Sequence, residues 1–269
     1  MTPILHKPDN FLVFSKEKLS NQFENTNYYL QSIQKSFLKN GLHVVAAEPK
    51  DSPAIVDFRN SRFSSPNPYT PYWMYHLTHF GNSTLLKSDK GEIKACLLEV
   101  SYSDPYKTSY QVLIAVAEEY SGKQIAPRLI QYVSLKAFIA GSKFVQGTIA
   151  PDNYSSLASF LNHCGAILTE YAEDFCGFGP RFIFKIPLSL QAIFHQKIDK
   201  EQLKSLYTKQ IFSATDFQFI EANKIDEVQK VYKETNNRII ALFKEPITHK
   251  PIFLTTSFPE IESHQSGIF

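Results

Sequence analysis

Cysteine is scarce in this sequence, and the three that occur, Cys96, Cys164 and Cys176, show no metal-ligand spacing. An odd number of scattered cysteines argues against a disulfide framework and favours a reducing compartment. The first ten residues, MTPILHKPDN, lack the apolar core of a signal peptide, and no run approaches the roughly 18 apolar residues of a membrane helix. We therefore expect a cytoplasmic protein that neither enters a membrane nor holds a metal ion.

The charges are nearly balanced, with 28 Lys and Arg against 26 Asp and Glu and a net charge of +2. No basic block stands out, so nucleic-acid binding is not expected. The chain has 269 residues, of which 43% are hydrophobic, and this is enough for a large buried core. The length suits one large domain, or one domain with an extension.

The N-terminal part of the chain is expected to be mainly helical. Apolar residues recur at helical spacing over 17–40, and a strand signal follows at 42–49. Ser52 is placed to cap a short helix over 53–63, which has a proline at its first position. The stretch 64–80, rich in aromatic residues and proline, is expected to be a loop that runs into a short helix.

The middle of the chain changes to alternating strands and helices. Asp89-Lys90-Gly91 separates two strand signals and is typical of a hairpin turn. The pattern predicts an α/β (α+β) fold with a central mixed sheet of six to seven strands and helices on both faces. A right-handed crossover makes the third and fourth strands parallel neighbours. The expected strands are 82–88, 92–102, 108–116, 143–150, 166–171 and 181–188, and the expected helices are 126–140 and 153–165.

Residues 188–269 are expected to form a C-terminal extension. A helical pattern at 190–209 precedes a strand at 217–222, and the tail from 255 onwards is expected to be mobile. The stretch FQFIEANKIDEVQKVY weakly echoes LHVVAAEPKDSPAIVDF, so a degenerate partial repeat is one interpretation and coincidence is the other. Between strand and tail we expect a capped helix that ends before Pro246, with Asn223 as its cap and Ile225, Val228, Tyr232, Ile239 and Phe243 on one face.

The stretch AVAEEYSGKQIAPRLIQYV, residues 115–133, has the order strand, short polar loop, helix. The first N–H groups of a helix lack internal partners and, with the helix dipole, form a site for an anion. Gly122 lets a phosphate approach the main chain, and Lys123 and Arg128 add positive charge. The alternative is an ordinary helix start with solvated basic residues.

Together with the residues that follow it, this loop resembles the GNAT superfamily of acyl-CoA N-acyltransferases. In that family a strand ending in a V-x-P-E-Y-R-G-K-G-I-G type sequence leads into the pyrophosphate loop, and an asparagine, a serine-containing helix and a glycine follow the next strand. The resemblance covers about residues 82–187, so that 1–187 is interpreted as the acyltransferase domain, with 1–81 on its acceptor side. The matching residues are Val116, Glu119, Tyr120, Gly122, Lys123, Ile125, Ala126, Asn153, Ser156, Leu157 and Gly165.

The loop departs from the family's usual pattern, (Gln/Arg)-x-x-Gly-x-(Gly/Ala), because these positions are Ser121, Gln124 and Ala126 here. Phe160 also stands where many members have a tyrosine that returns a proton to the departing thiolate. The resemblance implies that the central sheet is splayed, with the splay expected after Val116. It also implies acetyl-CoA, or another acyl-CoA, as cosubstrate. It assigns the cosubstrate to residues of the strand end, the loop and the next helix, namely Ile114, Val116, Ser121, Gly122, Lys123, Gln124, Ile125, Ala126, Asn153, Ser156 and Phe160.

The implied reaction is direct attack of an amine on a thioester, which requires a base because an ammonium is not nucleophilic. Glu99 is the first candidate, since it lies between apolar neighbours in a strand, where burial raises the pKa of a carboxyl. A glutamate on an edge strand facing water is the alternative. Tyr154 and His163 are the candidates for the acid, and Cys164 is expected to be a small buried residue rather than a nucleophile.

The acceptor pocket is expected in the N-terminal part, from Arg59, Tyr72, Trp73 and His76. Aromatic rings with a polar rim suit a small organic amine, whereas aromatic packing of a long loop is the alternative. The expected partner is therefore a small-molecule amine, and a homodimer is compatible with the sequence. Two other functions stay open: a GNAT-like regulatory or interaction module that binds CoA or no ligand, and a transferase acting on a protein terminus or lysine.

Overall fold

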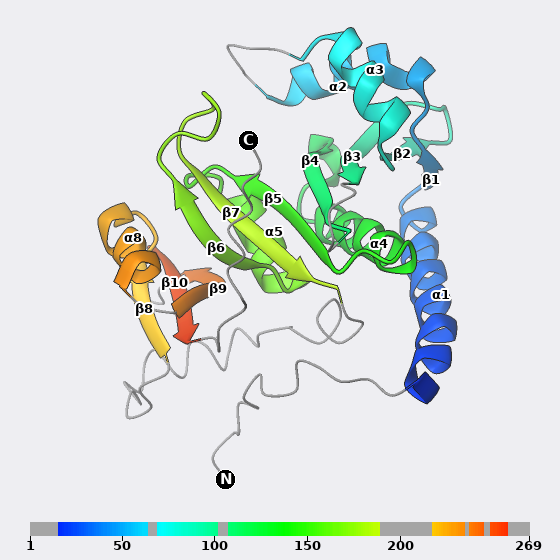
Figure 1. The fold of residues 1–269 in the computed structure, drawn as a ribbon. Coiled ribbons are helices and arrows are strands. Elements are labelled where there is room, and N and C mark those ends of the chain that lie inside the picture. The colour runs from blue at the N-terminus through cyan, green and yellow to red at the C-terminus, as the bar shows by residue number, and fades with distance from the viewer. Residues whose placement is uncertain are drawn as a thin grey trace.

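The structure is a computed structural model that describes residues 16–63, 69–101, 107–188, 217–234, 237–244 and 248–257. Its helices are α1 (Lys16–Leu38), α2 (Ser52–Arg62), α3 (Pro71–Phe80), α4 (Ile125–Ile139), α5 (Tyr154–Cys164) and α8 (Ile225–Glu234). Its strands are β1 (Leu42–Ala46), β2 (Thr84–Ser88), β3 (Ile93–Ser101), β4 (Ser109–Val116), β5 (Phe144–Ile149), β6 (Ile167–Ala172), β7 (Arg181–Pro187), β8 (Phe217–Glu221), β9 (Asn237–Lys244) and β10 (Pro251–Ser257). All of these strands join one mixed sheet in the order β1-β2-β3-β4-β5-β7-β6-β9-β10-β8 (Figure 1).

The elements predicted between residues 42 and 187 are all present, but the cap of α2 is a correction. Asp51 holds the N-cap position of α2, and Ser52 lies inside the helix, where its hydroxyl donates to the Pro49 carbonyl. The chain is already turning over Pro49–Asp51, a short 3-10 helix, before α2 begins. The helix predicted over 190–209 lies outside the described residues.

Helices cover both faces of the sheet, as the sequence predicts (Figure 1). Side chains of a strand alternate between its two faces. Ala95 and Leu97 of β3 belong to the core beneath α1, α4 and α5, whereas Cys96 and Leu98 pack with α2 and α3. We call these the α4 face and the α3 face of the sheet. None of the described helices combines the length and the apolar character needed to cross a membrane.

The parallel pairing of β4 with β5 confirms the predicted neighbours, but it is short. It joins only Ser109–Gln111 to Val145–Gly147. A Cβ on Gly147 would stand 2.8 Å from the Gln111 carbonyl oxygen, so a glycine is needed where the strands come closest. A bulge in the β3–β4 ladder at the same level bends β4 away. The splay therefore begins after Gln111, earlier than the expected position after Val116.

The C-terminal strands β9, β10 and β8 continue the sheet beyond β6, which raises the strand number from the expected six or seven to ten. Their core is continuous with the rest, because Ile239 and Phe253 belong to the α4-face core and Phe253 meets Phe182 edge-on at 5.6 Å. The echo between the two ends of the chain is limited to the order strand, turn, helix. In the sheet β8 pairs with β10, whereas β1 pairs with β2.

The helix expected to continue to Phe243 ends at Glu234, and Ile239 and Phe243 lie in β9. The sequence Arg-Ile-Ile-Ala-Leu-Phe favours a strand once β10 is available for pairing, and tertiary pairing overrides the helical spacing. Thr255 to Ser257, expected to begin a mobile tail, form the end of β10. The residues from 258 onwards lie outside the described part of the chain.

The side chain of Asn162 connects helix α5 to strand β9. Its side-chain nitrogen donates to the Leu242 carbonyl at 2.6 Å, and its side-chain oxygen accepts from the Leu242 N–H at 3.0 Å. The ladder between β6 and β9 contains only the pair Leu168–Ile239. The amide thus replaces backbone pairing that the strands themselves do not supply.

Asn162→Ala is expected to lower the free energy of unfolding by about 1–3 kcal/mol, because both polar groups of Leu242 lose their partner in a partly buried place. Denaturant unfolding measures this loss. Ser159→Ala, nearly one turn earlier on α5, removes only an exposed hydroxyl that donates to Ser155 and serves as the control. Equal stability of the two variants would contradict the role of Asn162.

Candidate active site

The separation of β4 from β5 leaves backbone groups of β4 without a strand partner. In an antiparallel pair, alternate residues direct their N–H and C=O groups to the same neighbour. The Ala117 N–H donates to the backbone carbonyl of Lys94, near the start of β3. The N–H groups of Ile114 and Val116 therefore point away from β3 and toward β5. No ladder pair with β5 reaches these two residues. The predicted contact residues Ile114 and Val116 are therefore placed in the opening between the strands.

The loop before α4 presents further backbone donors to the same region. The N–H groups of Gly122, Gln124, Ile125 and Ala126 have no acceptor in the described part of the chain, whereas Ser121 and Lys123 donate within the turn. Gly122 has φ +73°, and a Cβ there would meet no atom within 4 Å. The main chain at Gly122 is thus open, as an approaching phosphate requires.

Gln124 adopts the left-handed conformation, with φ 61°, at the position where the family pattern has glycine. The backbone geometry of a glycine loop is therefore kept by a residue that disfavours it. A left-handed conformation costs an ordinary residue about 1–2 kcal/mol. The Lys123 ammonium lies 4.9 Å from the centre of the Tyr120 ring, so this positive charge is held beside the loop.

Gln124→Gly is expected to raise the free energy of unfolding by about 1 kcal/mol, since it removes the strain of a left-handed residue. Lys123→Gly is the control, because Lys123 does not have a positive φ and gains nothing from glycine. Denaturant unfolding of both variants measures the difference. A loss of stability in Gln124→Gly would mean that the glutamine side chain holds the loop.

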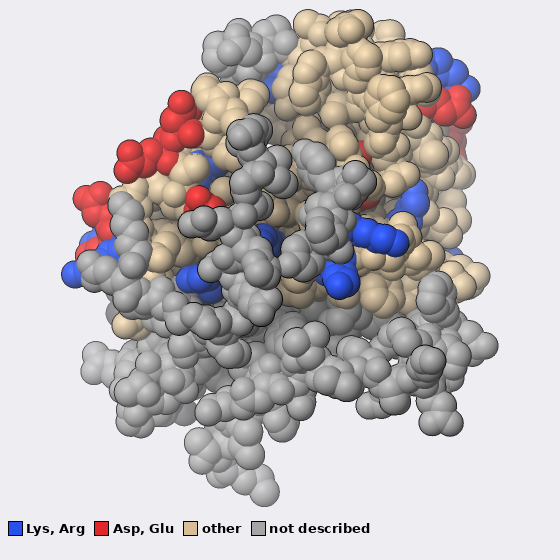
Figure 2. All heavy atoms as spheres, viewed as in Figure 1, with Lys and Arg blue, Asp and Glu red and all other residues tan. Residues whose placement is uncertain are grey.

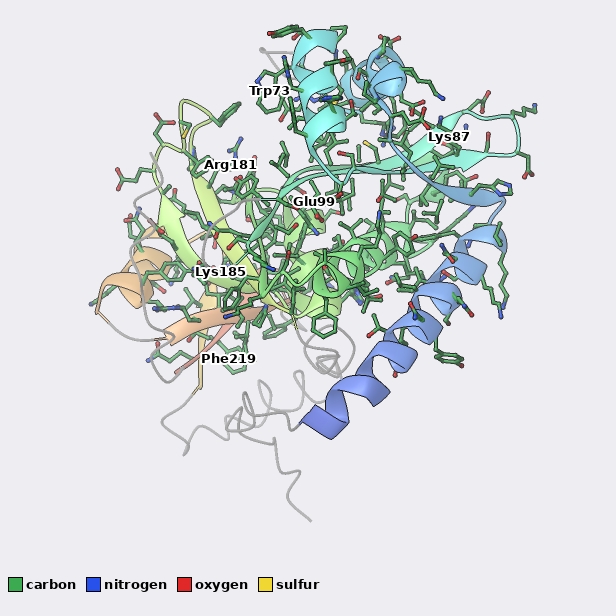
Figure 3. The ribbon with its side chains drawn as sticks, turned by 45° about the vertical axis from the view of Figure 1, so that its right-hand side comes forward. Trp73, Lys87, Glu99, Arg181, Lys185 and Phe219 are labelled. Carbon is green, nitrogen blue, oxygen red and sulfur yellow. The ribbon has the colours of Figure 1, made fainter. Side chains whose placement is uncertain are left out.

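Glu99 lies in β3 near the start of the splay, and Figure 3 shows it at the centre of the molecule. It is 2% exposed, so the alternative of a glutamate facing water is wrong. By alternation from Ala95 and Leu97, its side chain faces α4. Burial raises the pKa of Glu99 to about 7, and the Ser109 hydroxyl and the charge of Lys136 on α4 act in the opposite direction.

Gln111 is the cross-strand partner of Glu99 and was not recognised from the sequence as a site residue. It is 6% exposed, and neither its Nε2 nor its Oε1 has a hydrogen-bond partner in the described residues; the same holds for Glu99 Oε2. Buried polar atoms without protein partners are sites for internal water. The sequence did carry a signal for Gln111, because Ser109 and Gln111 are polar residues at alternate positions of β4 that face a core.

The predicted site residues at the start of α5 and within it differ in burial and in role. The Asn153 side chain caps α5 by accepting from the Ser156 N–H at 3.1 Å, which fixes the start of the helix. Phe160 is 3% exposed and packs on Phe184 with ring centres 4.3 Å apart, so its ring is part of the core. Tyr154, at the first position of α5, is 37% exposed and is the more accessible aromatic residue.

The predicted acceptor residues lie on the α3 face. Tyr72 and Trp73 project from α3 and are 74% and 49% exposed, and His76 is half-buried against Tyr72. Arg59 of α2 is buried, with its guanidinium 4.4 Å from the centre of the Tyr69 ring. Figure 2 shows lysine and arginine side chains in the middle of one face, and acidic side chains gathered over α8 and the β6–β7 loop.

Two of the three cysteines, Cys96 and Cys164, are buried, whereas Cys176 is exposed. Cys164 is buried, donates weakly to the Pro127 carbonyl, and burial raises its pKa. Burial also raises the pKa of Cys96 to about 12. These are properties of inert core residues, in line with the interpretation of Cys164 as a small buried residue.

Comparisons with known proteins find likeness only in solved structures. No protein-family profile matches the sequence, and no curated protein matches it. An Ard1 from Thermoplasma volcanium shares 14% identity at a TM-score of 0.48, over 55% of this chain and 99% of the other. A GNAT-family acetyltransferase from Streptococcus pneumoniae has the same identity and coverage at a TM-score of 0.46. A spermidine N-acetyltransferase from Vibrio cholerae shares 18% identity at a TM-score of 0.45, over 55% of this chain and 94% of the other. The likeness concerns the fold of about half of this chain.

Proposed function

We propose that this chain is an N-acyltransferase that uses acyl-CoA, with acetyl-CoA as the first candidate, and acts on the amine of a small molecule. The observation that carries the proposal is the separation of β4 from β5 after Gln111, which leaves the N–H groups of Ile114 and Val116 unpaired within the described part of the chain. The open N–H groups of Gly122, Gln124, Ile125 and Ala126 follow in the loop after the same strand. One continuous line of backbone donors suits a long ligand that ends in a pyrophosphate.

The residues present fit such a ligand. The loop N–H groups of Gly122, Gln124, Ile125 and Ala126 would hold the pyrophosphate, with the Lys123 charge beside them. The N–H groups of Ile114 and Val116 would bind the extended arm of CoA and polarise the thioester carbonyl. Acyl-CoA supplies an activated acyl group, and the chain supplies position, charge and a path for the amine's proton.

Glu99 is proposed as the base, acting through water. Its carboxylate faces α4, whereas the candidate acceptor residues lie on the α3 face, so a relay is needed between them. The unpartnered atoms of Glu99 and Gln111 supply the polar groups that such a water requires. With a pKa of about 7, Glu99 is poised to accept a proton near neutral pH.

Tyr154 is the first candidate to return a proton to the leaving thiolate and His163, in the last turn of α5, is the second, because Phe160 carries no hydroxyl and is buried. The lack of a hydroxyl at Phe160 favours a second candidate function, a GNAT-like module that binds CoA without efficient turnover. A transferase acting on protein termini or lysines is the third candidate, and the exposed aromatic side chains of α3 would then contact a peptide.

Two measurements separate these functions. Acetyl-CoA should raise the melting temperature of the protein, and a ligand-free module would show no shift. Thiol release with small amines, compared with peptides, then tests catalysis and acceptor type. Binding without thiol release from any acceptor would leave the CoA-binding module as the function.

A further inference from the structure

Two arginines flank the opening between β4 and β5 on the α3 face. Arg62 of α2 reaches Glu118, just beyond β4, at 3.4 Å, and Arg59 lies nearly one turn earlier on the same helix. Arg59 is thereby placed over the last part of β4. On the other side, Phe182 pairs with Ile149, so Arg181 lies just beyond the end of β5. Alternation along β7 puts Arg181 on the α3 face, because Phe182 and its alternates fill the α4-face core.

Arg59 is a buried cation that has no counter-ion among the described residues. It is 7% exposed, and its Nε has no hydrogen-bond partner in the described residues. One nitrogen, Nη1, donates to Asn60 Oδ1 at 3.0 Å, and the rings of Tyr69 and Phe63 lie 4.4 Å and 5.5 Å from the guanidinium. No carboxylate of the described residues lies within 4.0 Å of it. The rings hold the guanidinium flat and in place, but they do not neutralise it.

The charge of Arg181 acts on Tyr69, the residue whose ring lies against Arg59. The Nη1 of Arg181 donates to the Pro180 carbonyl at 2.8 Å, and Arg181 forms no ion pair with the described residues. Burial raises the pKa of Tyr69, and the charges of Arg59 and Arg181 both oppose that shift, so both act on the Tyr69 hydroxyl. Trp73, which packs on Tyr69 at 5.4 Å, extends the site along α3, and Figure 3 shows Trp73 and Arg181 on these two elements.

We propose that Arg59 and Arg181 form a receptor for a carboxylate of the acceptor, so that the substrates are amines that also carry a carboxylate, such as amino acids. A planar guanidinium that is held in place and has no carboxylate partner among the described residues can bind a carboxylate of a ligand by two parallel hydrogen bonds. The desolvated position of Arg59 strengthens that attraction. This inference rests on the proposed function for its substrate class, and on the two arginines for its chemistry.

The first experiment compares amines that differ only at the carboxylate. Thiol release is measured for a panel of amino acids and for their carboxamides, with wild type, Arg181→Gln and Lys185→Gln. Lys185 lies on the same face of β7 and is the control. We expect amino acids to exceed their amides in kcat/KM by about tenfold or more in wild type and Lys185→Gln, and this preference to be lost in Arg181→Gln.

A second experiment needs no turnover. N-acetyl amino acids and their amides are compared as ligands by the shift in melting temperature, again in the three proteins. Stabilisation by the acids alone, lost in Arg181→Gln and kept in Lys185→Gln, supports the receptor. Equal shifts for acids and amides, or no shift, overturn it.

The two experiments separate failure of the inference from failure of the proposed function. If amines are acetylated but acids have no advantage over amides, the receptor is wrong and the acyltransferase stands. If no amine is acetylated, the acyltransferase fails, and the melting experiment decides on the receptor by itself. Arg59→Lys keeps the charge but loses the flat fork, and in a folded variant it should reduce the same preference.

Discussion

Glu99→Gln is expected to lower turnover by about 10²–10⁴-fold at neutral pH while the affinity for acetyl-CoA stays close to that of wild type. Glutamine keeps the shape of the side chain and removes its basicity. Part of the activity should return at higher pH, where more of the amine is already deprotonated. In wild type, activity should rise with pH through about 7, because the carboxylate form of Glu99 is the base. The measurement is steady-state thiol release from pH 6 to 9.

The same variant has a stability signature that is independent of turnover. The pKa of Glu99 is raised in the folded state, so its protonated form is the one that the fold tolerates. The unfavourable contribution is absent below the unfolded pKa and grows as pH rises from about 4.5 to about 7, to the order of 3 kcal/mol. Glu99→Gln should therefore gain stability relative to wild type on going from pH 4 to pH 8.

Glu170→Gln is the control for both measurements, because Glu170 is an exposed glutamate on β6. It should change neither turnover nor the pH dependence of stability. Full activity of Glu99→Gln from pH 6 to 9 would place the base elsewhere. An altered pH dependence of stability together with normal turnover would make Glu99 a buried carboxyl without a catalytic role.

Gly122→Val is expected to weaken acetyl-CoA binding by about tenfold or more, up to about a thousandfold. Each N–H that loses a charged partner costs about 1.5–3 kcal/mol, and the valine side chain would occupy the open space beside the main chain. Valine also disfavours the φ of +73°, so the loop would move. Isothermal titration calorimetry with acetyl-CoA measures the loss.

Gly91→Val is the matched control, since Gly91 has φ +79° and equally open surroundings in the β2–β3 hairpin and is not one of the proposed pyrophosphate donors. Both variants should lose similar stability, and only Gly122→Val should lose affinity. Unchanged affinity in a folded Gly122→Val protein would exclude the loop as the pyrophosphate site. Equal losses in both variants would point to a general effect on folding.

The sequence predicted those elements whose patterns are local. The turn Asp89-Lys90-Gly91 and the helical spacing over 17–40 each specify their own element, and both elements are present. The ladder of β9 is different, because Ile239 and Phe243 fit a helix period as well as a strand. Only the presence of β10 beside them decides between the two. The junction at Asn162 depends on residues 80 positions apart and left no local trace.

The candidate site was predictable where chemistry and position coincide in one stretch. Gly122 and Glu99 stand out by their local context, a polar loop before a helix and an acid inside an apolar strand. The start of the splay depends on Gly147 and on the bulge opposite Glu99, which become visible only when three strands are assembled. Arg181 escaped notice for the same reason, because its place beside the opening is set by the pairing of β7 with β5.

A crystal structure of the protein with CoA tests the central claim most directly. The account predicts a pyrophosphate on the N–H groups of Gly122 to Ala126 and the pantetheine arm between β4 and β5, along the N–H groups of Ile114 and Val116. Glu99 and Gln111 should hold ordered water on the side of the reactive sulfur. CoA bound elsewhere, or a space between β4 and β5 that stays empty at saturating CoA, would contradict it.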